Sequence, residues 1–325
     1  MRPRNQAGFT LIEMMVALAL FSFAIVGILS VATAMSGNVK EQRQVVQTET
    51  DVRAPMDFLA DTLRMASPSI QSGNIQDATI AGCTIVAAGF TGVGGLSVLD
   101  SNSAPDQLDV VFAYGSSVAT LQTPYTVGTQ TSITITNDHN QASQIFPGDK
   151  LLLSNTAQGT IVSVSLVNTG TGVITLNTAA CAPTLPTGGY AGGSLVLRVM
   201  RARFSVGTVD NIPTLMMDPD ADGPLAAQPL AEGIEDMQIA VGTDADGNGS
   251  ISAAEWANSS TTGALVGPIR AVRLTLISRS NSALAGVATA GQRKAAENRP
   301  AGAADAYRRR YLTQTIEVRN LGGSP

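Results

Sequence analysis

A long apolar segment near the amino terminus constrains this chain more than any other feature. From Met14 to Val39 there is no charged residue, and most positions carry Ala, Val, Leu, Ile, Phe or Met. About 20 apolar residues are enough for a helix to cross a bilayer, and this segment is apolar on every side rather than amphipathic. We therefore expect a membrane-spanning helix. Because Arg2 and Arg4 precede it, the start of the chain is expected in the cytoplasm and the rest outside.

A carboxylate stands inside this apolar segment. Near the start of a spanning helix, Glu13 costs on the order of 2–3 kcal/mol, so we expect it to have a partner or a function. Thr10 and Glu13 have the spacing of a capping box, which explains locally why the carboxylate is tolerated. An ordinary secretory signal, cut beside Ala32–Ala34, is the alternative. That alternative does not explain why a basic leader ends in Gly8 directly before Phe9.

After the apolar segment the chain turns polar but keeps a helical period. We expect residues 36–67 to continue the same helix, with a kink near Pro55 and an end at Ser67-Pro68. Its apolar stripe should pack against the remainder of the chain. The residues of that stripe are Val45, Val52, Met56, Leu59 and Leu63.

Beyond about residue 75 the pattern changes to short β-type runs separated by Gly, Asn, Asp, Pro and Ser. Aromatic residues make up 4% of the chain and charged residues 14%, which favours strands joined by small polar loops. We therefore predict an α+β protein, with Ala283–Ala306 as a mobile loop. The predicted strands are Thr84–Ala88, Leu108–Tyr114, Ser132–Thr136, Lys150–Leu153, Thr160–Val167, Gly172–Asn177, Leu195–Phe204, Asp236–Val241, Ala271–Ser278 and Thr315–Arg319.

The block Gly8-Phe9-Thr10-Leu11-Ile12-Glu13, followed by an apolar helix, resembles the type III signal of prepilins. Type IV pilins and the pseudopilins of type II secretion share this signal. The resemblance implies that prepilin peptidase cuts between Gly8 and Phe9 and methylates the new amino terminus. It also implies that Glu13 pairs with the Phe9 amine of a neighbouring subunit, where opposite charges in a medium of low dielectric constant attract strongly.

The same resemblance implies a type IV pilin-like fold. Residues 1–8 would be the leader, residues 9–35 the transmembrane helix and residues 36–67 its amphipathic continuation. Residues 75–325 would form the β-rich extracytoplasmic head. The protein would lie in the inner membrane before assembly, and in a pilus or pseudopilus after it.

Two segments of the head resemble PilW-type minor pilins and, second to them, the J-type pseudopilin of type II secretion. They are the helix end Phe58–Ala66 and the tail, in which Arg308-Arg309-Arg310-Tyr311 precedes Thr315–Leu321. The first interpretation is a minor pilin that acts in filament initiation, assembly or at the tip. The resemblance implies other minor and major pilins as partners through the helix. The alternatives are the J-type pseudopilin and an adhesin or binding module on a pilin stem.

The chain contains two cysteines, Cys83 and Cys181, and no CxxC motif. In an exported domain a single disulfide is the natural prediction. Two buried free thiols remain open, because spacing does not show that two cysteines meet.

A metal motif occurs between two predicted strands, with the pattern D-x-[DN]-x-[DN]-G-x5-E. Calcium takes six to eight oxygen ligands, and this spacing wraps a loop around the ion. The preceding segment alternates like a strand, so we expect a strand–loop–short helix site rather than a full EF-hand; a solvated turn is the alternative. The expected ligands are Asp244, Asp246, Asn248, Ser250, Ser252 and Glu255.

A second acidic cluster, Asp218–Asp222, begins in the same way but has Pro229 where the last carboxylate should be. The formal net charge of −5 argues against general nucleic-acid binding, which needs a basic surface. His139, the one histidine, lies in a polar segment without a second histidine, and no catalytic motif is present. The sequence therefore predicts a structural subunit and not an enzyme.

Overall fold

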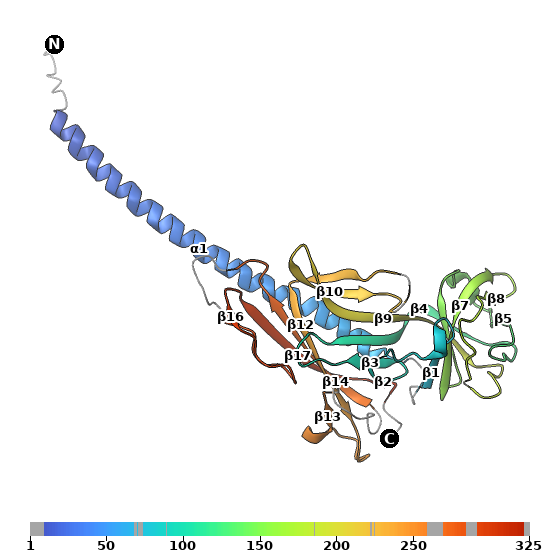
Figure 1. Cartoon of the computed structure of the whole chain (residues 1–325). Coiled ribbons are helices and arrows are strands. Elements are labelled where there is room, and N and C mark those ends of the chain that lie inside the picture. Colours follow the sequence, from blue (N-terminus) through green and yellow to red (C-terminus); the bar gives the residue numbers. More distant parts are fainter. Residues whose placement is uncertain are drawn as a thin grey trace, which may run out of the picture. The chain divides into compact units, whose positions relative to one another are not determined.

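The computed structural model describes residues 10–67, 70, 74–88, 90–184, 186–221, 223, 225–258, 269–283 and 291–321. The chain divides into two compact units, Met1–Gln47 and Thr48–Pro325. In the first unit the described residues belong to the helix α1 (Leu11–Arg64) and to Thr10 before it. Figure 1 shows α1 and the labelled strands. A long helix together with a β-rich head confirms the predicted α+β class.

The carboxyl-terminal part of α1 belongs to the second unit and supplies one side of its core. Val52, Met56, Leu59 and Leu63 are buried there, and they cluster with side chains from both sheets. This confirms the predicted apolar stripe for these four positions. The helix continues through Pro55, where the sequence predicted a kink, and ends at Arg64, before the predicted stop.

The larger sheet has 11 strands, and its main path runs β2-β3-β4-β9-β6-β7-β8-β5. Beside this path β1 pairs with β7, β10 pairs with β9, and β11 pairs with β10. The strands are β1 (Asn74–Asp77), β2 (Thr91–Val93), β3 (Leu96–Leu99), β4 (Gln107–Thr120), β5 (Ser132–Thr134), β6 (Lys150–Ser154), β7 (Gln158–Asn168), β8 (Val173–Leu176), β9 (Leu195–Val209), β10 (Ile212–Asp218) and β11 (Gln228–Glu232).

The smaller sheet has the order β13-β12-β14-β17, and all its pairs are antiparallel. A short two-stranded sheet, β15–β16, follows β14 in the sequence. The strands are β12 (Ile234–Thr243), β13 (Trp256–Ala257), β14 (Ile269–Arg279), β15 (Gly291–Gln292), β16 (Ala304–Asp305) and β17 (Arg309–Glu317).

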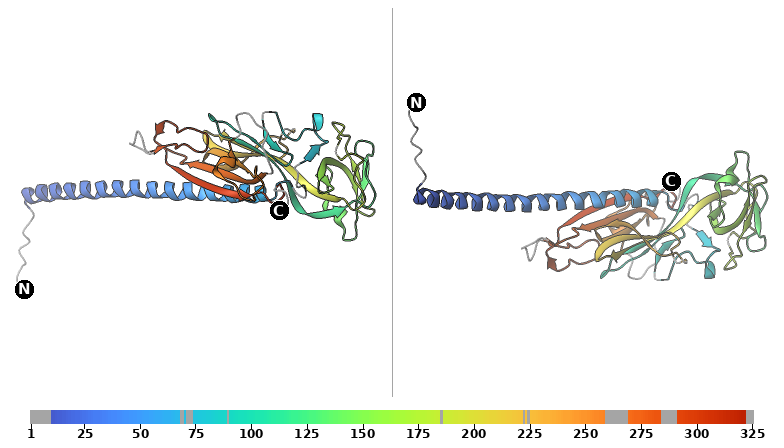
Figure 2. Two further views of the ribbon diagram at one scale, coloured as in Figure 1. Left: turned by 90° about the horizontal axis from the view of Figure 1, so that it is seen from below. Right: turned by 90° about the horizontal axis from the view of Figure 1, so that it is seen from above.

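Two long strands, β4 and β9, connect the parts of the second unit. Near α1 their buried side chains, such as Leu108 and Phe204, join the core that the helix covers. Farther along, Ala119 and Val196 join a second core made by β5, β6, β7 and β8. The pairing of β4 with β9 shifts register between Ala113 and Val118, as a β-bulge does where a strand bends. We call residues 119–196 the β5–β8 lobe; it lies at one end of the sheets, away from β12 and β17 (Figures 1 and 2).

Three predictions for the head are wrong. The segment Thr84–Ala88 is not a strand, because a turn with positive φ at Gly82 and Cys83 precedes it. The closing strand is β17, which begins at Arg309 rather than Thr315. Within Ala283–Ala306, residues 284–290 lie outside the described part, but residues 291–306 hold β15, β16 and several ion-paired side chains instead of a free loop.

Candidate functional site

The start of α1 is built around the Thr10–Glu13 pair. The Thr10 N–H and hydroxyl both donate to Glu13 Oε2 at 2.9 Å, and the Glu13 N–H donates to Thr10 Oγ1 at 3.3 Å. These bonds satisfy amides that have no partner within a helix, as a capping box does. Gly8 and Phe9, the predicted cleavage site, lie outside the described residues. Their roles and the intersubunit pairing of Glu13 therefore stay predictions.

The helix beyond Glu13 offers apolar side chains on every face. The segment Leu11–Thr33 has a mean hydropathy of 2.5 and none of it is buried in the structure, so it is long and apolar enough to span a membrane. Among the exposed side chains are Leu18, Phe21, Phe23 and Val26. Exposed residues of this size over a whole helix need an apolar solvent or other helices around them.

The two marks of the head that resembled PilW-type proteins meet in space. Asn320, in the tail, donates from Nδ2 to the Ala66 carbonyl at 3.0 Å, just after α1. Upstream of it, Arg309 forms ion pairs with Glu235 and Asp305 while its side chain is only 4% exposed. The carboxylates raise the pKa of the Arg309 guanidinium, with Asp305 as the largest cause. The tail therefore ties the helix end and β17 to the head.

The disulfide prediction is confirmed. Cys83 and Cys181 are bonded, with 5.6 Å between their Cα atoms and a sequence separation of 98 residues. The bond joins the turn after β1 to the segment that follows β8.

The acidic loop directly follows β12, and its carboxylates converge. Oxygen atoms of Asp244, Asp246 and Glu255 lie within 4.8 Å of one another, which is a spacing that could hold a metal ion. The strand before the loop confirms that the site is not a full EF-hand, and the expected short helix is a single 3-10 turn, Ala253–Glu255. Ser252 caps this turn, so that its N–H donates to Glu255 Oε2 at 2.7 Å.

Asp244 is the buried member of the three, with 1% of its surface exposed. Its Oδ2 accepts the Gly249 N–H at 3.0 Å and the Arg270 Nε–H at 2.7 Å. Its Oδ1 is buried without a hydrogen-bond partner among the described residues. A buried carboxylate oxygen that lacks a donor is costly, and a cation would satisfy it.

Other expected ligands form hydrogen bonds with one another inside the loop. Asn248 Oδ1 accepts the N–H and the hydroxyl of Ser250 at 2.8 and 2.6 Å. Asn248 in turn donates from Nδ2 to Asp246 Oδ2 at 2.7 Å. Hydrogen bonds from the backbone and side chain of Ser252 lower the pKa of Glu255. The structure thus gathers the three expected carboxylate ligands, Asp244, Asp246 and Glu255.

A hydrophobic contact fixes the loop to its strand. A Cβ on Gly242 would lie 2.7 Å from Ile251 Cδ1 and 3.1 Å from Trp256 Cζ3, so the two side chains fill the space over this glycine. Arg273 lies over the Trp256 ring, 4.5 Å from its centroid, and pairs with Glu297. Ile251 therefore packs inward, over Gly242 of β12.

The structure shows how two further charged residues, Arg270 and Asp236, lie relative to the loop. Arg270, 26 residues from Asp244 in the sequence, forms an ion pair with it. Asp236 does not belong to the loop: it is fully buried and pairs with Arg293 and Arg299. Of the second acidic cluster, Asp218 accepts the Asp220 N–H, and burial raises the pKa of Asp218. Asp222 lies outside the described residues, so a second cation site there stays a prediction.

Comparison with known proteins adds two matches in the sequence. Residues 3–33 match the prokaryotic N-terminal methylation motif, and residues 203–320 match the family described as type IV pilus-assembly protein W. No curated protein matches the chain. A similar solved structure is a type IV-like pilin from Thermus thermophilus, with 14% identity over 55% of this chain and 87% of the other, and a TM-score of 0.25. The family match over residues 203–320 contains β12, the acidic loop, β14 and β17, whereas the β5–β8 lobe lies outside this match.

Proposed function

We propose that this chain, which belongs to the type IV pilus-assembly protein W family, is a minor pilin that acts in filament initiation or at the filament tip. The observation that carries this function is the presence of both matched segments on one chain, an N-terminal methylation motif in residues 3–33 and a pilus-assembly region in residues 203–320. Such a protein is a structural subunit and not an enzyme. The tip position follows from its resemblance to minor pilins.

The amino-terminal residues carry the processing step. Prepilin peptidase cuts between Gly8 and Phe9 and methylates Phe9, which leaves a mature chain that starts at the apolar helix. Residues 9–35 then lie in the inner membrane, residues 36–67 continue the helix, and residues 75–325 form the extracytoplasmic head. The exposed apolar faces of Leu11–Thr33 support this placement, because they suit lipid before assembly and neighbouring pilin helices after it.

Glu13 would select the register of the subunit in the filament. Its carboxylate pairs with the Phe9 amine of a neighbour, and this attraction is strong where no water screens it. Within one chain the Thr10 N–H and hydroxyl already hold the Glu13 side chain at the start of α1. The carboxylate is therefore oriented before a partner arrives.

The test compares two carboxylates on the same helix. Glu13→Ala should insert into the membrane at least as well as the unmutated chain, yet fail to enter filaments. Glu49→Ala, which removes an exposed carboxylate paired with Arg53, should assemble normally. Pili are counted by electron microscopy in a strain that lacks the chromosomal copy, and the subunit is detected in sheared pili. Normal piliation and incorporation of Glu13→Ala would contradict the pairing.

Processing is tested separately by intact mass. Gly8→Arg should leave the leader attached and the amino terminus unmethylated, so the membrane fraction contains only the longer species. A mature chain that still begins at Phe9 in this variant would show that the leader assignment is wrong. If Gly8→Arg is not processed while Glu13→Ala assembles normally, the leader assignment is supported and the pairing role of Glu13 is not.

The acidic loop is a structural calcium site in this proposal. Asp244, Asp246 and Glu255 already converge, and the unpartnered Asp244 Oδ1 provides a buried ligand. Asn248 Oδ1, the Ser250 carbonyl and a water on Ser252 would supply the remaining oxygens that a calcium ion requires. Magnesium substitutes poorly, since it requires short, regular octahedral ligation and keeps its waters.

Calcium binding is measured by titration calorimetry of the chelator-treated full chain in detergent. One ion should bind, and stability should rise by about 2.7 kcal/mol at a free calcium concentration of a hundred times the dissociation constant. Asp246→Asn and Glu255→Gln should weaken binding, while Asp210→Asn, an exposed carboxylate in another turn, should not. No heat and no melting shift at millimolar calcium would contradict the site. Equal binding by all variants would place it elsewhere.

A further inference from the structure

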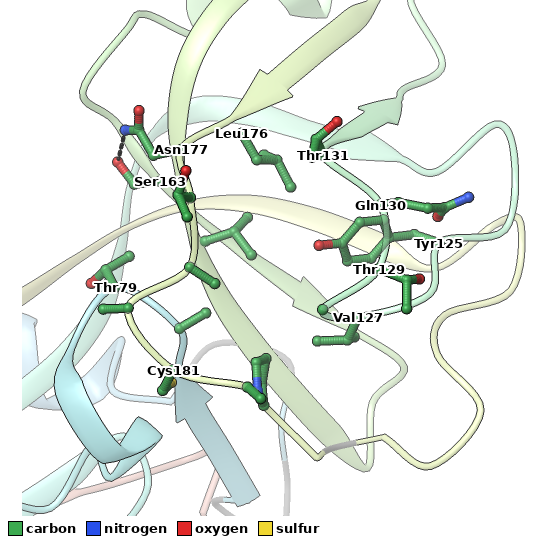
Figure 3. A pocket seen from close by; sticks show the side chains of 18 residues that line it. Thr79, Tyr125, Val127, Thr129, Gln130, Thr131, Ser163, Leu176, Asn177 and Cys181 are labelled. Atoms are coloured by element: carbon green, nitrogen blue, oxygen red, sulfur yellow. Dashed lines mark hydrogen bonds between the residues drawn. The ribbon is translucent and has the colours of Figure 1, made fainter.

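The β5–β8 lobe contains a cavity that the pilin functions above do not use. Its volume is ≈ 670 Å³, which is within the range of small-molecule sites. One wall is formed by Tyr125 and residues 127–131, the opposite wall is formed by residues 176–183, and Val162 and Ser163 of strand β7 line the space between them. Figure 3 shows the side chains that face this space.

The lining has a consistent chemistry. None of the 18 residues that line the cavity is an acid, a lysine, an arginine or a histidine. Apolar surface comes from Val127, Val162 and Leu176, and most of the remaining side chains end in a hydroxyl or an amide. The polar groups shown in Figure 3 include those of Tyr125, Thr129, Gln130, Thr131, Ser163 and Asn177.

The Tyr125 hydroxyl is the observation that points to a ligand. The side chain has 5% of its surface exposed, yet its hydroxyl remains accessible from the cavity and makes no hydrogen bond to another described residue. In Figure 3 the hydroxyl points toward the space between the two walls. Burial raises the pKa of Tyr125, so the group stays a neutral O–H donor. The other buried tyrosine of the lobe, Tyr190, donates to Thr160 Oγ1 at 2.9 Å, as buried hydroxyls usually do.

The walls are held in place without a ligand. The disulfide fixes Cys181 to Cys83, and the Ala180 N–H donates to the Ala78 carbonyl at 2.8 Å. On the opposite wall Gln130 Oε1 accepts the Thr126 N–H at 2.8 Å. A cavity with fixed walls loses little conformational entropy when it binds.

The same contacts decide against two classes of ligand. An anion would need a basic side chain or a cluster of free N–H donors, and no lysine, arginine or histidine lines the cavity. An extended peptide would need free backbone groups along a strand edge. Here the walls use those groups on one another: the Leu176 N–H donates to Thr131 O and the Asn177 N–H to Ser163 O.

We propose that this cavity binds a neutral saccharide. Sugar hydroxyls donate and accept, as the Thr, Ser, Gln and Asn groups of the lining do, and the C–H faces of a sugar ring suit Val127 and Leu176. The Tyr125 hydroxyl then donates to a sugar oxygen. Such a site would let a pilus subunit recognise a glycan on a surface or in a matrix. The saccharide proposal does not depend on the role of the chain in pilus assembly.

The test uses the full chain in lauryldimethylamine oxide, since glycoside detergents would compete for the cavity. The probes are glucose, galactose, mannose, N-acetylglucosamine, lactose and maltose. Binding of each sugar is measured by saturation-transfer NMR and by titration. At least one should bind saturably, and glucuronic acid should bind more weakly than glucose. Tyr125→Phe, which removes only the unpartnered hydroxyl, should weaken binding about threefold to tenfold.

Two further variants show whether the effect belongs to the cavity. Asn177→Ala should also weaken binding, whereas Tyr190→Phe, which removes a buried hydroxyl outside the lining, should leave affinity unchanged. Melting curves confirm that each variant is folded. Absence of saturable binding by every neutral sugar would overturn the proposal. Equal affinity of Tyr125→Phe and the unmutated chain, or tighter binding of an uncharged peptide such as a short Thr/Ser-rich probe, would overturn it as well.

Discussion

The sheet of β12, β14 and β17 and the β5–β8 lobe are stabilised by different kinds of interaction. In the sheet and its flanking segments, arginines from β14, β17 and residues 293–299 form ion pairs with the acids of β12 and its neighbours. In the lobe only Asp138, Asp149 and Lys150 carry a formal charge. A disulfide joins the segment 176–183 of the lobe to Cys83, which lies outside the lobe. Both regions bury apolar cores of their own.

The difference shows how the two regions respond to their surroundings. Ion pairs depend on pH and salt, so the β12–β14–β17 sheet should respond to both. A lobe with so few charges should respond less to pH, but it depends on an oxidising compartment for its covalent link. The regions also differ in what they can hold: the sheet ends in a carboxylate loop suited to a cation, and the lobe encloses a neutral polar cavity.

Removal of the disulfide should have the largest effect. The double substitution Cys83→Ala and Cys181→Ala releases a closed loop with a sequence separation of 98 residues. In the chain-entropy model a loop of this length contributes about 4–5 kcal/mol to the free energy of unfolding. Thermal and denaturant unfolding should show this loss, and reductant should reproduce it in the unmutated chain. Unchanged unfolding under both treatments would show that the lobe does not need its covalent link.

The corresponding test in the β12–β14–β17 sheet is the substitution Asp236→Ala. The carboxylate is fully buried between Arg293 and Arg299, so its removal leaves two poorly solvated arginines without their partner. We expect a loss of about 3 kcal/mol in the free energy of unfolding. Glu317→Ala on β17 is the control, because that side chain is exposed, and its effect should be small. A loss below that of the control would mean that the ion pairs do not hold residues 293–299.

These two regions were not equally predictable from the sequence. In the lobe, Lys150–Leu153, Thr160–Val167 and Gly172–Asn177 were found as strands, because alternation and glycine turns mark them. In the charged region, composition was misleading. Residues 293–299 lie in an Ala- and Gly-rich stretch that predicts a loop, and the acids that hold them, Asp236 among them, are far away in the sequence.

The remaining misses have local causes. Strand β11 contains Pro229, and a proline argues against a strand except at an edge; β11 pairs with β10 alone. The acidic loop was predictable because its ligands are close in sequence, whereas Arg270 reaches it from strand β14. The cavity was not predictable, because its lining comes from segments around residues 78, 125, 163 and 180 that carry no motif.

Asp106 should make the sheet region pH-sensitive in a specific direction. Burial is the main cause that raises its pKa to about 7, although the N–H groups of Ser101 and Ile239 donate to it. Because the pKa of Asp106 is higher in the folded chain than in the unfolded chain, the protonated carboxyl contributes to the free energy of unfolding. This contribution is complete at a pH below the pKa of the unfolded chain and is lost as the pH rises toward 7. From pH 5 to pH 8 the unmutated chain should therefore lose about 2–3 kcal/mol more than Asp106→Asn. Parallel pH profiles of the two proteins would contradict this.

The smallest expected effect is at Arg270 and concerns the proposed calcium site. Its Nε lies 2.7 Å from Asp244 Oδ2, so a positive charge stands beside a ligand of the ion. Because Arg270 is 28% exposed, solvent screens this repulsion, and Arg270→Gln should raise calcium affinity only about threefold to tenfold. Arg270→Lys keeps the charge and should change it less. Calorimetry on the chelator-treated chain distinguishes the two roles open to this side chain: weaker binding in Arg270→Gln would mean that it orients Asp244 rather than competing with the cation.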